Sequence, residues 1–106
     1  MTSDALQKLY NTILSRRGAD ASSSYTASLF AKGVNKITQK VGEEAIETCI
    51  ESINGNAEKI KQESADLIYH LMVLWAHHGI TPEDVMSVLE AREGISGIDE
   101  KNSRHK

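Results

Sequence analysis

Hydrophobic residues recur along most of this chain at intervals of three and four, the spacing that places side chains on one face of an α-helix. Between Val34 and Asn54 the series is long and regular; it comprises Ile37, Val41, Ala45, Ile46, Cys49, Ile50 and Ile53. A second series, from about Ala57 to His78, comprises Ile60, Leu67, Ile68, Leu71, Met72, Leu74 and Trp75. Asn54-Gly55-Asn56 separates the two series and is typical of a break between helices. The pattern therefore predicts a hairpin of two long helices.

Two shorter helices are expected before this hairpin. The first runs from about Asp4 to Arg17 and stops at Gly18, which places Arg16 and Arg17 in its last turn. A polar stretch, residues 19–24, leads into a second short helix that ends near Gly33.

A last helix is expected after the hairpin. Thr81 followed by Pro82 and two acids is typical of a helix start, because a hydroxyl caps the helix and Pro suits its first position. This helix is expected to end at Gly94, and the tail from about residue 95 to be loosely held. The fold class predicted for residues 1–106 is a single all-α domain.

Composition and charge narrow the function classes. The formal net charge of -3 argues against a nucleic-acid footprint, which needs a basic excess. A single cysteine, Cys49, excludes a disulfide framework and a thiolate zinc site within one chain, and its apolar neighbours predict a small core residue. No apolar stretch is long enough for a membrane helix or a signal peptide, so no membrane partner is expected and the cytoplasm is the expected compartment.

The two long helices also predict self-association. Each is roughly 30 Å long, and one hairpin offers too little surface to bury both apolar stripes. A homodimer with a four-helix-bundle core would bury them, and it is expected to form around Ile46, Ile50, Leu67, Leu71 and Trp75. The alternative is a compact monomer in which the short helices cover the hairpin.

Acidic residues lie beside the apolar stripes of both long helices. Glu43, Glu44, Glu47 and Glu51 share one side of the first helix, and Glu63 and Asp66 share one face of the second. If the helices pack by their apolar faces, the carboxylates meet across the seam and repel, and a hard divalent cation removes this conflict. Oxygen ligands favour magnesium (Mg2+) or manganese (Mn2+) over zinc. The alternative is an ordinary solvated acidic surface.

The residues that carry these acids resemble a known family. The segments 40–47 (KVGEEAIE) and 63–71 (ESADLIYHL) are similar to the phosphoribosyl-ATP pyrophosphatase family, part of the all-α, MazG-like nucleotide pyrophosphatases. The superfamily signature is Glu-Glu-x-x-Glu followed by Glu-x-x-Asp. The segments 16–20 (RRGAD), 23–26 (SSYT), 29–33 (LFAKG) and 92–94 (REG) extend the resemblance to the histidine-biosynthesis member. Some relatives carry a zinc-dependent cyclohydrolase domain, for which this chain is too short and too poor in cysteine.

The resemblance implies magnesium-dependent hydrolysis of phosphoribosyl-ATP to phosphoribosyl-AMP and pyrophosphate. Four acids match the family's metal ligands, with Glu43 as the nearest further acid: Glu44, Glu47, Glu63 and Asp66. Basic residues are the expected phosphate contacts: Arg16, Arg17, Lys32, Lys36 and Lys40. The two arginines have an alternative role as complements of a helix dipole. His70 either orients a metal ligand or is a core or surface histidine.

Two other functions stay open from the sequence. A related pyrophosphatase acting on nucleoside triphosphates would keep every acid. A non-catalytic helical dimerisation module would need no cation and would leave the placement of the acids unexplained.

Overall fold

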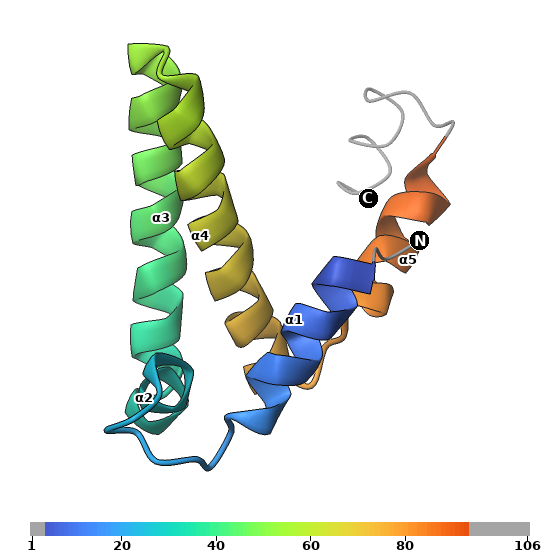
Figure 1. The fold of residues 1–106 in the computed structure, drawn as a ribbon. Coiled ribbons are helices and arrows are strands. Elements are labelled where there is room, and N and C mark those ends of the chain that lie inside the picture. Colours follow the sequence, from blue (N-terminus) through green and yellow to red (C-terminus); the bar gives the residue numbers. More distant parts are fainter. Residues whose placement is uncertain (1–3, 94–106) are drawn as a thin grey trace.

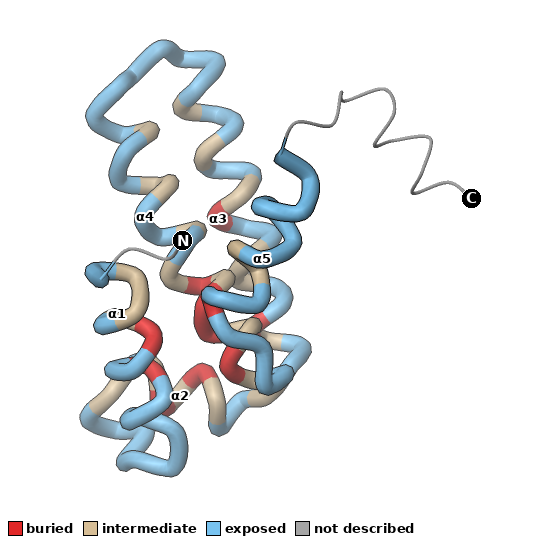
Figure 2. The backbone as a smooth tube through the Cα atoms, turned by 90° about the vertical axis from the view of Figure 1, so that its right-hand side faces the viewer, coloured by how far each residue is buried: buried red, intermediate tan, exposed pale blue. Residues whose placement is uncertain are grey.

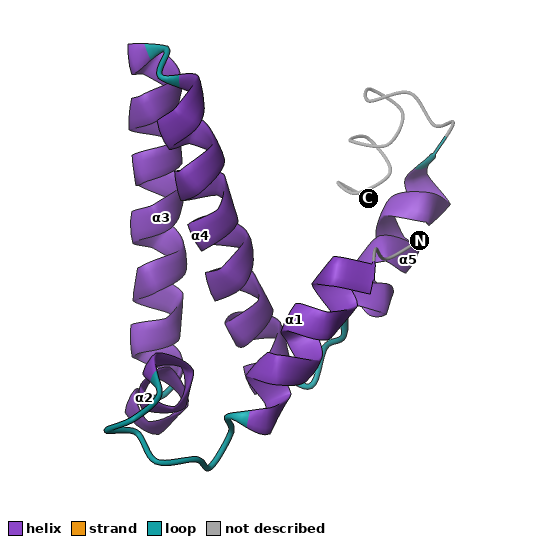
Figure 3. Cartoon of the chain, viewed as in Figure 1, coloured by secondary structure: helices purple, strands orange, loops and turns teal. Residues whose placement is uncertain are grey.

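Two long helices form the centre of the structure, a computed structural model that describes residues 4–93. α3 (Val34–Asn54) and α4 (Ala57–His77) pack against each other as an antiparallel hairpin, as Figure 1 shows. Figure 3 shows helices joined by loops, with no strand among the described residues. The all-α class and the hairpin are therefore confirmed. The tail predicted from about residue 95 lies outside the described residues.

The hairpin turn follows from its glycine and the asparagine beside it. Gly55 has φ 71°, in the left-handed region, and its N–H donates to the carbonyls of Glu51 and Ser52, which ends α3. The side chain of Asn56 accepts a hydrogen bond from the N–H of Lys59 and so caps α4. One turn thus satisfies polar groups at both helix ends.

Three shorter helices flank the hairpin: α1 (Asp4–Ser15), α2 (Tyr25–Lys32) and α5 (Pro82–Arg92). α2 packs across the end of the hairpin that is opposite Gly55. α1 packs against α4 and contacts α5, and these two helices form an arm that diverges from the hairpin in Figure 1. The predicted helix start at Thr81 is confirmed as a capping box, in which the side chain of Asp84 accepts from the Thr81 N–H.

The predicted end of α1 was slightly wrong. α1 ends at Ser15 because the N–H groups of Arg16 and Arg17 bond three residues back, to Ile13 and Leu14, which tightens the chain into a turn. The two arginines therefore follow the helix instead of completing it. α5 ends at Arg92, and the predicted end at Gly94 lies outside the described residues.

The core lies where α1 and α2 pack against the half of the hairpin that is opposite Gly55. Its buried members are Tyr10, Ile13, Leu29, Ile37, Met72, Val73 and Ala76. Trp75 and Leu74 are partly buried and pack against this cluster. Figure 2 shows that the half of the hairpin near Gly55 is mostly exposed.

Cys49 corrects one prediction, because its side chain is exposed and not part of the core. It lies on a face of α3 that none of the other described helices covers. On this face Ile46, Ile50 and Ile53 are 62%, 50% and 87% exposed. The helical spacing identified an apolar face correctly, but no other helix within residues 4–93 packs on that face.

Candidate metal centre

The hairpin pairs the acids of α3 with those of α4. Glu44 and Asp66 are each eleven residues from Gly55, and Glu47 and Glu63 are each eight. In an antiparallel pair, residues at equal distance from the turn lie at the same height, so each acid on one helix has a counterpart on the other. Carboxylate oxygens of Glu44, Glu63 and Asp66 all lie within 4.8 Å of one another. We call Glu44, Glu47, Glu63 and Asp66 the acidic cluster.

The electrostatics of the cluster are unfavourable without a counter-charge. Glu44 is only 7% exposed, and burial, followed by the nearby carboxylates of Glu47 and Glu63, raises its pKa to about 7. The pKa of Glu63 is also raised, chiefly by the adjacent Glu47. A glutamate pKa near neutrality indicates that several carboxylates lie close together in a partly buried place, which is common at functional sites.

Two oxygen atoms of the cluster have no hydrogen-bond partner. The Oε2 atoms of Glu44 and Glu63 are buried and unpaired within residues 4–93. Buried polar atoms of this kind are rare in proteins unless an ion or water satisfies them. The donor set is made of carboxylate oxygens alone, which suits Mg2+ or Mn2+ and not the softer zinc. The residues present therefore fit a hard divalent cation.

Lys40 and Glu43 lie at the edge of the cluster. The Lys40 Nζ is 3.3 Å from Oε1 of Glu43 and 3.8 Å from Oε1 of Glu44. Glu43 also accepts a hydrogen bond of 2.8 Å from Gln39, and the bonds from Gln39 and Lys40 lower its pKa. Glu43 is thus engaged with its own helix, whereas Lys40 borders the buried Glu44.

The other predicted basic residues are placed differently. Arg17 donates to the carbonyl of Ala76 at 2.8 Å, and its guanidinium lies 5.2 Å from the centre of the Phe30 ring. Ala76 is ten residues beyond Asp66 on α4, roughly 15 Å along the helix. The positive charge of Arg17 therefore complements the carboxyl end of the α4 dipole, whereas the sequence analysis considered the dipole of the first helix.

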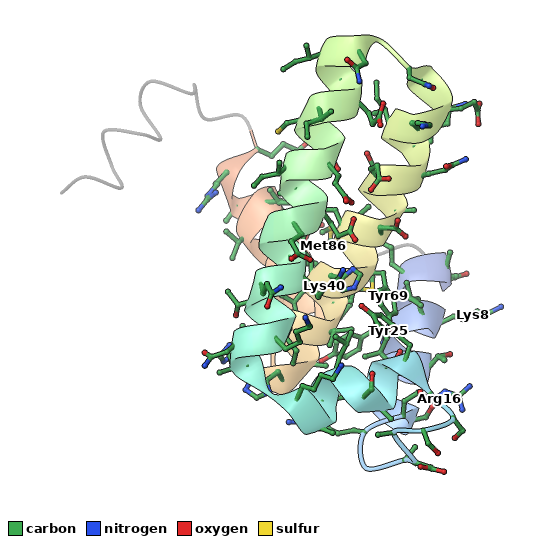
Figure 4. The ribbon with its side chains drawn as sticks, turned by 90° about the vertical axis from the view of Figure 1, so that its left-hand side faces the viewer. Lys8, Arg16, Tyr25, Lys40, Tyr69 and Met86 are labelled. Carbon is green, nitrogen blue, oxygen red and sulfur yellow. The ribbon has the colours of Figure 1, made fainter. Side chains whose placement is uncertain are left out.

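Three further basic residues were predicted to contact phosphate: Arg16, Lys32 and Lys36. Figure 4 shows Arg16 at the α1–α2 end of the molecule, away from Lys40. Lys32 is exposed at the end of α2. Lys36 is half-buried on α3, and its charge contributes to the lowered pKa of Glu43 after the larger contributions of Gln39 and Lys40. Within one chain, Lys36 and Lys40 are the predicted substrate contacts that lie on the helix of the cluster.

His70 and two tyrosines adjoin the cluster, and sequence reasoning assigned the tyrosines no role. His70 is 5% exposed, and its Nδ1 is 2.8 Å from the main-chain carbonyl of Asp66. Its Nε2 is 3.0 Å from the hydroxyl of Tyr25. Tyr69 is hydrogen-bonded through its hydroxyl to Thr26. Two features of the sequence could have indicated these roles: the Ser-Tyr-Thr segment, which contains Tyr25, and the four-residue spacing from Asp66 to His70.

The fold and the cluster together define a class of protein. It is an all-α protein whose helical hairpin holds an oxygen-ligand site suited to a divalent cation, the chemistry that accompanies phosphate substrates. None of its described helices combines the length and the apolar character that crossing a membrane requires.

Comparison with known proteins identifies the family. Residues 6–93 match the family model described as phosphoribosyl-ATP pyrophosphohydrolase. The chain is 55% identical to a phosphoribosyl-ATP pyrophosphatase of Gluconobacter oxydans over 95% of its own length and 76% of that protein. It is 57% identical to that of Azospirillum brasilense, over 93% and 89% of the two chains. For the protein of Paramagnetospirillum magneticum the identity is 51%, over 98% and 95%. The chain belongs to the phosphoribosyl-ATP pyrophosphohydrolase family, and the resemblance found in the sequence is confirmed.

Proposed function

We propose that this protein hydrolyses phosphoribosyl-ATP to phosphoribosyl-AMP and pyrophosphate in histidine biosynthesis, in the cytoplasm and with Mg2+ or Mn2+ as cofactor. The observation that carries the proposal is the acidic cluster, in which Glu44 is buried and two carboxylate oxygens are buried and unpaired, in a chain of this family. A solvated acidic surface would leave no carboxylate oxygen buried and unpaired.

The acidic cluster is the proposed cation site. Glu44, Glu63 and Asp66 approach closely enough to share one ion, and Glu47 adjoins both Glu44 and Glu63. When bound, the cation supplies positive charge that neutralises the leaving pyrophosphate and acidifies the attacking water. The carboxylates fix the position of that charge because they project from two packed helices.

The remaining steps belong to the chain's own groups. A carboxylate of the cluster that does not bind the cation accepts the proton of the water as its oxygen attacks phosphorus. The new P–O bond forms as the bond between the α and β phosphates breaks, and pyrophosphate leaves with the electron pair. Lys40, beside Glu44, and Lys36, one turn earlier on α3, contact phosphate oxygens and offset their charge.

We also propose that the protein is a homodimer. The face of α3 that carries Ile46, Cys49, Ile50 and Ile53 is exposed in one chain, although its residues are apolar. A second copy that packs on this face would complete a four-helix core, with Leu67, Leu71 and Trp75 of α4 as further contacts. Such a dimer would also allow Arg16, Arg17 and Lys32 of one chain to approach the cluster of its partner.

The test of function is pyrophosphate release from phosphoribosyl-ATP and from ATP, each with Mg2+ and with EDTA. We expect turnover of phosphoribosyl-ATP only, and only with the cation. Preference for ATP would indicate the related nucleoside triphosphate pyrophosphatase. Absence of turnover with both substrates would indicate the non-catalytic dimerisation module, and full activity in excess EDTA would reject the metal site.

A further inference from the structure

Tyr25 is half exposed and yet held in place from two sides. Its side chain is 53% exposed at the first position of α2. Its ring stacks on that of Tyr69, with centroids 6.2 Å apart and an interplanar angle of 25°, and meets the ring of His70 edge-on at 5.9 Å. The hydroxyl is bonded to His70, which is buried. An exposed aromatic ring that is fixed in this way loses little conformational freedom when a ligand packs on it.

The hydrogen bonds around His70 determine what Tyr25 can offer a ligand. The carbonyl of Asp66 can only accept a hydrogen bond, so in the neutral imidazole Nδ1 carries the proton and Nε2 accepts. The Tyr25 hydroxyl then donates to Nε2 and has no proton left for a phosphate oxygen. What Tyr25 presents to solvent is therefore the face of an aromatic ring and the lone pairs of its oxygen.

Tyr25 also lies next to the acidic cluster. A single imidazole ring separates its hydroxyl from the backbone of Asp66. Lys40 is close to both sites: its Nζ lies 3.8 Å from Oε1 of Glu44, and its charge interacts with the phenol group of Tyr25. Figure 4 shows Lys40, Tyr25 and Tyr69 in the region where α2 meets the hairpin. In a nucleotide, one ribose separates the base from the α-phosphate, so a base at Tyr25 matches an α-phosphate at the cluster.

We propose that Tyr25 is a positioning residue whose ring stacks against the purine base of the substrate, while His70 and Tyr69 hold that ring in place. The proposal rests on the proposed function, which supplies a substrate with a base. A phosphate is a poor occupant of this position because the phenol proton points inward. A purine fits, since every base has a π-face and its N–H groups can donate to the phenol oxygen.

Two substitutions separate the ring from its hydroxyl. Tyr25→Leu removes both, and Tyr25→Phe removes the hydroxyl alone, so both leave Nε2 of His70 without its donor. Tyr10→Phe is the matched control, because it removes a tyrosine hydroxyl that donates to the Ile80 carbonyl at 2.6 Å in the core. The kcat and KM of each variant are measured for phosphoribosyl-ATP with saturating Mg2+, together with inhibition by inorganic tripolyphosphate, which has no base.

Loss of one stacked base contact corresponds to a roughly 5- to 150-fold weaker interaction. We expect Tyr25→Leu to raise KM within this range with a smaller change in kcat, Tyr25→Phe to recover most of the affinity, and Tyr10→Phe to keep the wild-type KM. Inhibition by tripolyphosphate should be equally strong for wild type and Tyr25→Leu. Light scattering should give both variants the mass of the wild type.

Four results would overturn the role proposed for Tyr25, and a fifth would reject the proposed function. An equal rise of KM in Tyr25→Leu and Tyr25→Phe would assign the effect to the hydroxyl, and weaker inhibition by tripolyphosphate would assign Tyr25 to the phosphates. A changed mass would make Tyr25 an interface residue. Wild-type protein that does not turn over phosphoribosyl-ATP would reject the proposed function itself. Wild-type turnover with an unchanged KM in Tyr25→Leu would reject only the role of Tyr25.

Discussion

Replacing Glu44 by Gln should make the metal-free protein more stable at alkaline pH while abolishing its activity. Gln keeps the shape of the side chain but carries no charge. In the wild type the pKa of Glu44 is raised from 4.5 to about 7 by burial and by Glu47 and Glu63. A carboxyl group whose folded-state pKa is raised holds its proton more tightly in the folded state. Its contribution to stability is therefore present below pH 4.5 and is lost as the pH rises through 7.

The size of this effect follows from the shift. A change from 4.5 to about 7 corresponds to at most about 3 kcal/mol of unfolding free energy. Because Glu44 titrates together with its neighbours and the cluster can relax, we expect about 1–2 kcal/mol. For a chain of this length that is a shift of roughly 5 to 15 °C in melting temperature.

The assay is thermal or urea unfolding in EDTA at fixed chain concentration, from pH 5 to pH 8. Wild type should lose stability across this window, and Glu44→Gln should lose much less. Glu51→Gln, two turns further along α3, is the control and should follow the wild type. Parallel pH profiles for wild type and Glu44→Gln would refute the argument. Adding Mg2+ at pH 8 should restore stability to wild type and Glu51→Gln but not to Glu44→Gln, by about 3 kcal/mol at a hundredfold excess over its dissociation constant.

Three further outcomes are expected. Asp66→Asn should reduce pyrophosphate release by about a hundredfold or more with little loss of folding, whereas Glu51→Gln should leave pyrophosphate release nearly unchanged. Similar activities of the two variants would show that the cluster is an ordinary acidic surface. Ile50→Asp places a charge on the 50% exposed face proposed for the dimer, so the mass by light scattering should halve while far-UV circular dichroism keeps its helical signal; an unchanged dimer would move the interface elsewhere. Arg17→Met removes the donor to the Ala76 carbonyl and should lower the unfolding free energy by about 1–3 kcal/mol, measured by urea denaturation; an unchanged midpoint would contradict its role at the end of α4.

The sequence predicted the hairpin and the meeting of its acids because both depend on local periodicity. Once Gly55 ends one helix and Asn56 begins the next, the heights of Glu44 and Asp66 are set by counting residues from the turn. The placement of Arg17 could not be obtained in this way. It depends on how α1 and its loop cross the end of α4, and no spacing along the chain encodes a contact 59 residues away.

The misjudged burial of Cys49 and the overlooked Tyr25 have related causes. Periodicity identifies an apolar face but does not say whether the chain itself or another copy covers it, and Cys49 lies on such an uncovered face. Tyrosine occurs both on protein surfaces and in cores, so the residue type alone did not indicate a role for Tyr25. The bond to His70, 45 residues away, and the stacking on Tyr69 distinguish it from an ordinary surface tyrosine.

The equal spacing of the acids about Gly55 means that each long helix carries one half of the cluster on a continuous stretch of chain. Breaking the backbone between Gly55 and Asn56 would leave Glu44 and Glu47 on one fragment and Glu63 and Asp66 on the other. Neither fragment would carry all four carboxylates of the proposed cation site, so packing of the two helices would have to bring them together. The protein is thus a natural scaffold for fragment complementation, in which the return of pyrophosphate release reports the association of two polypeptides.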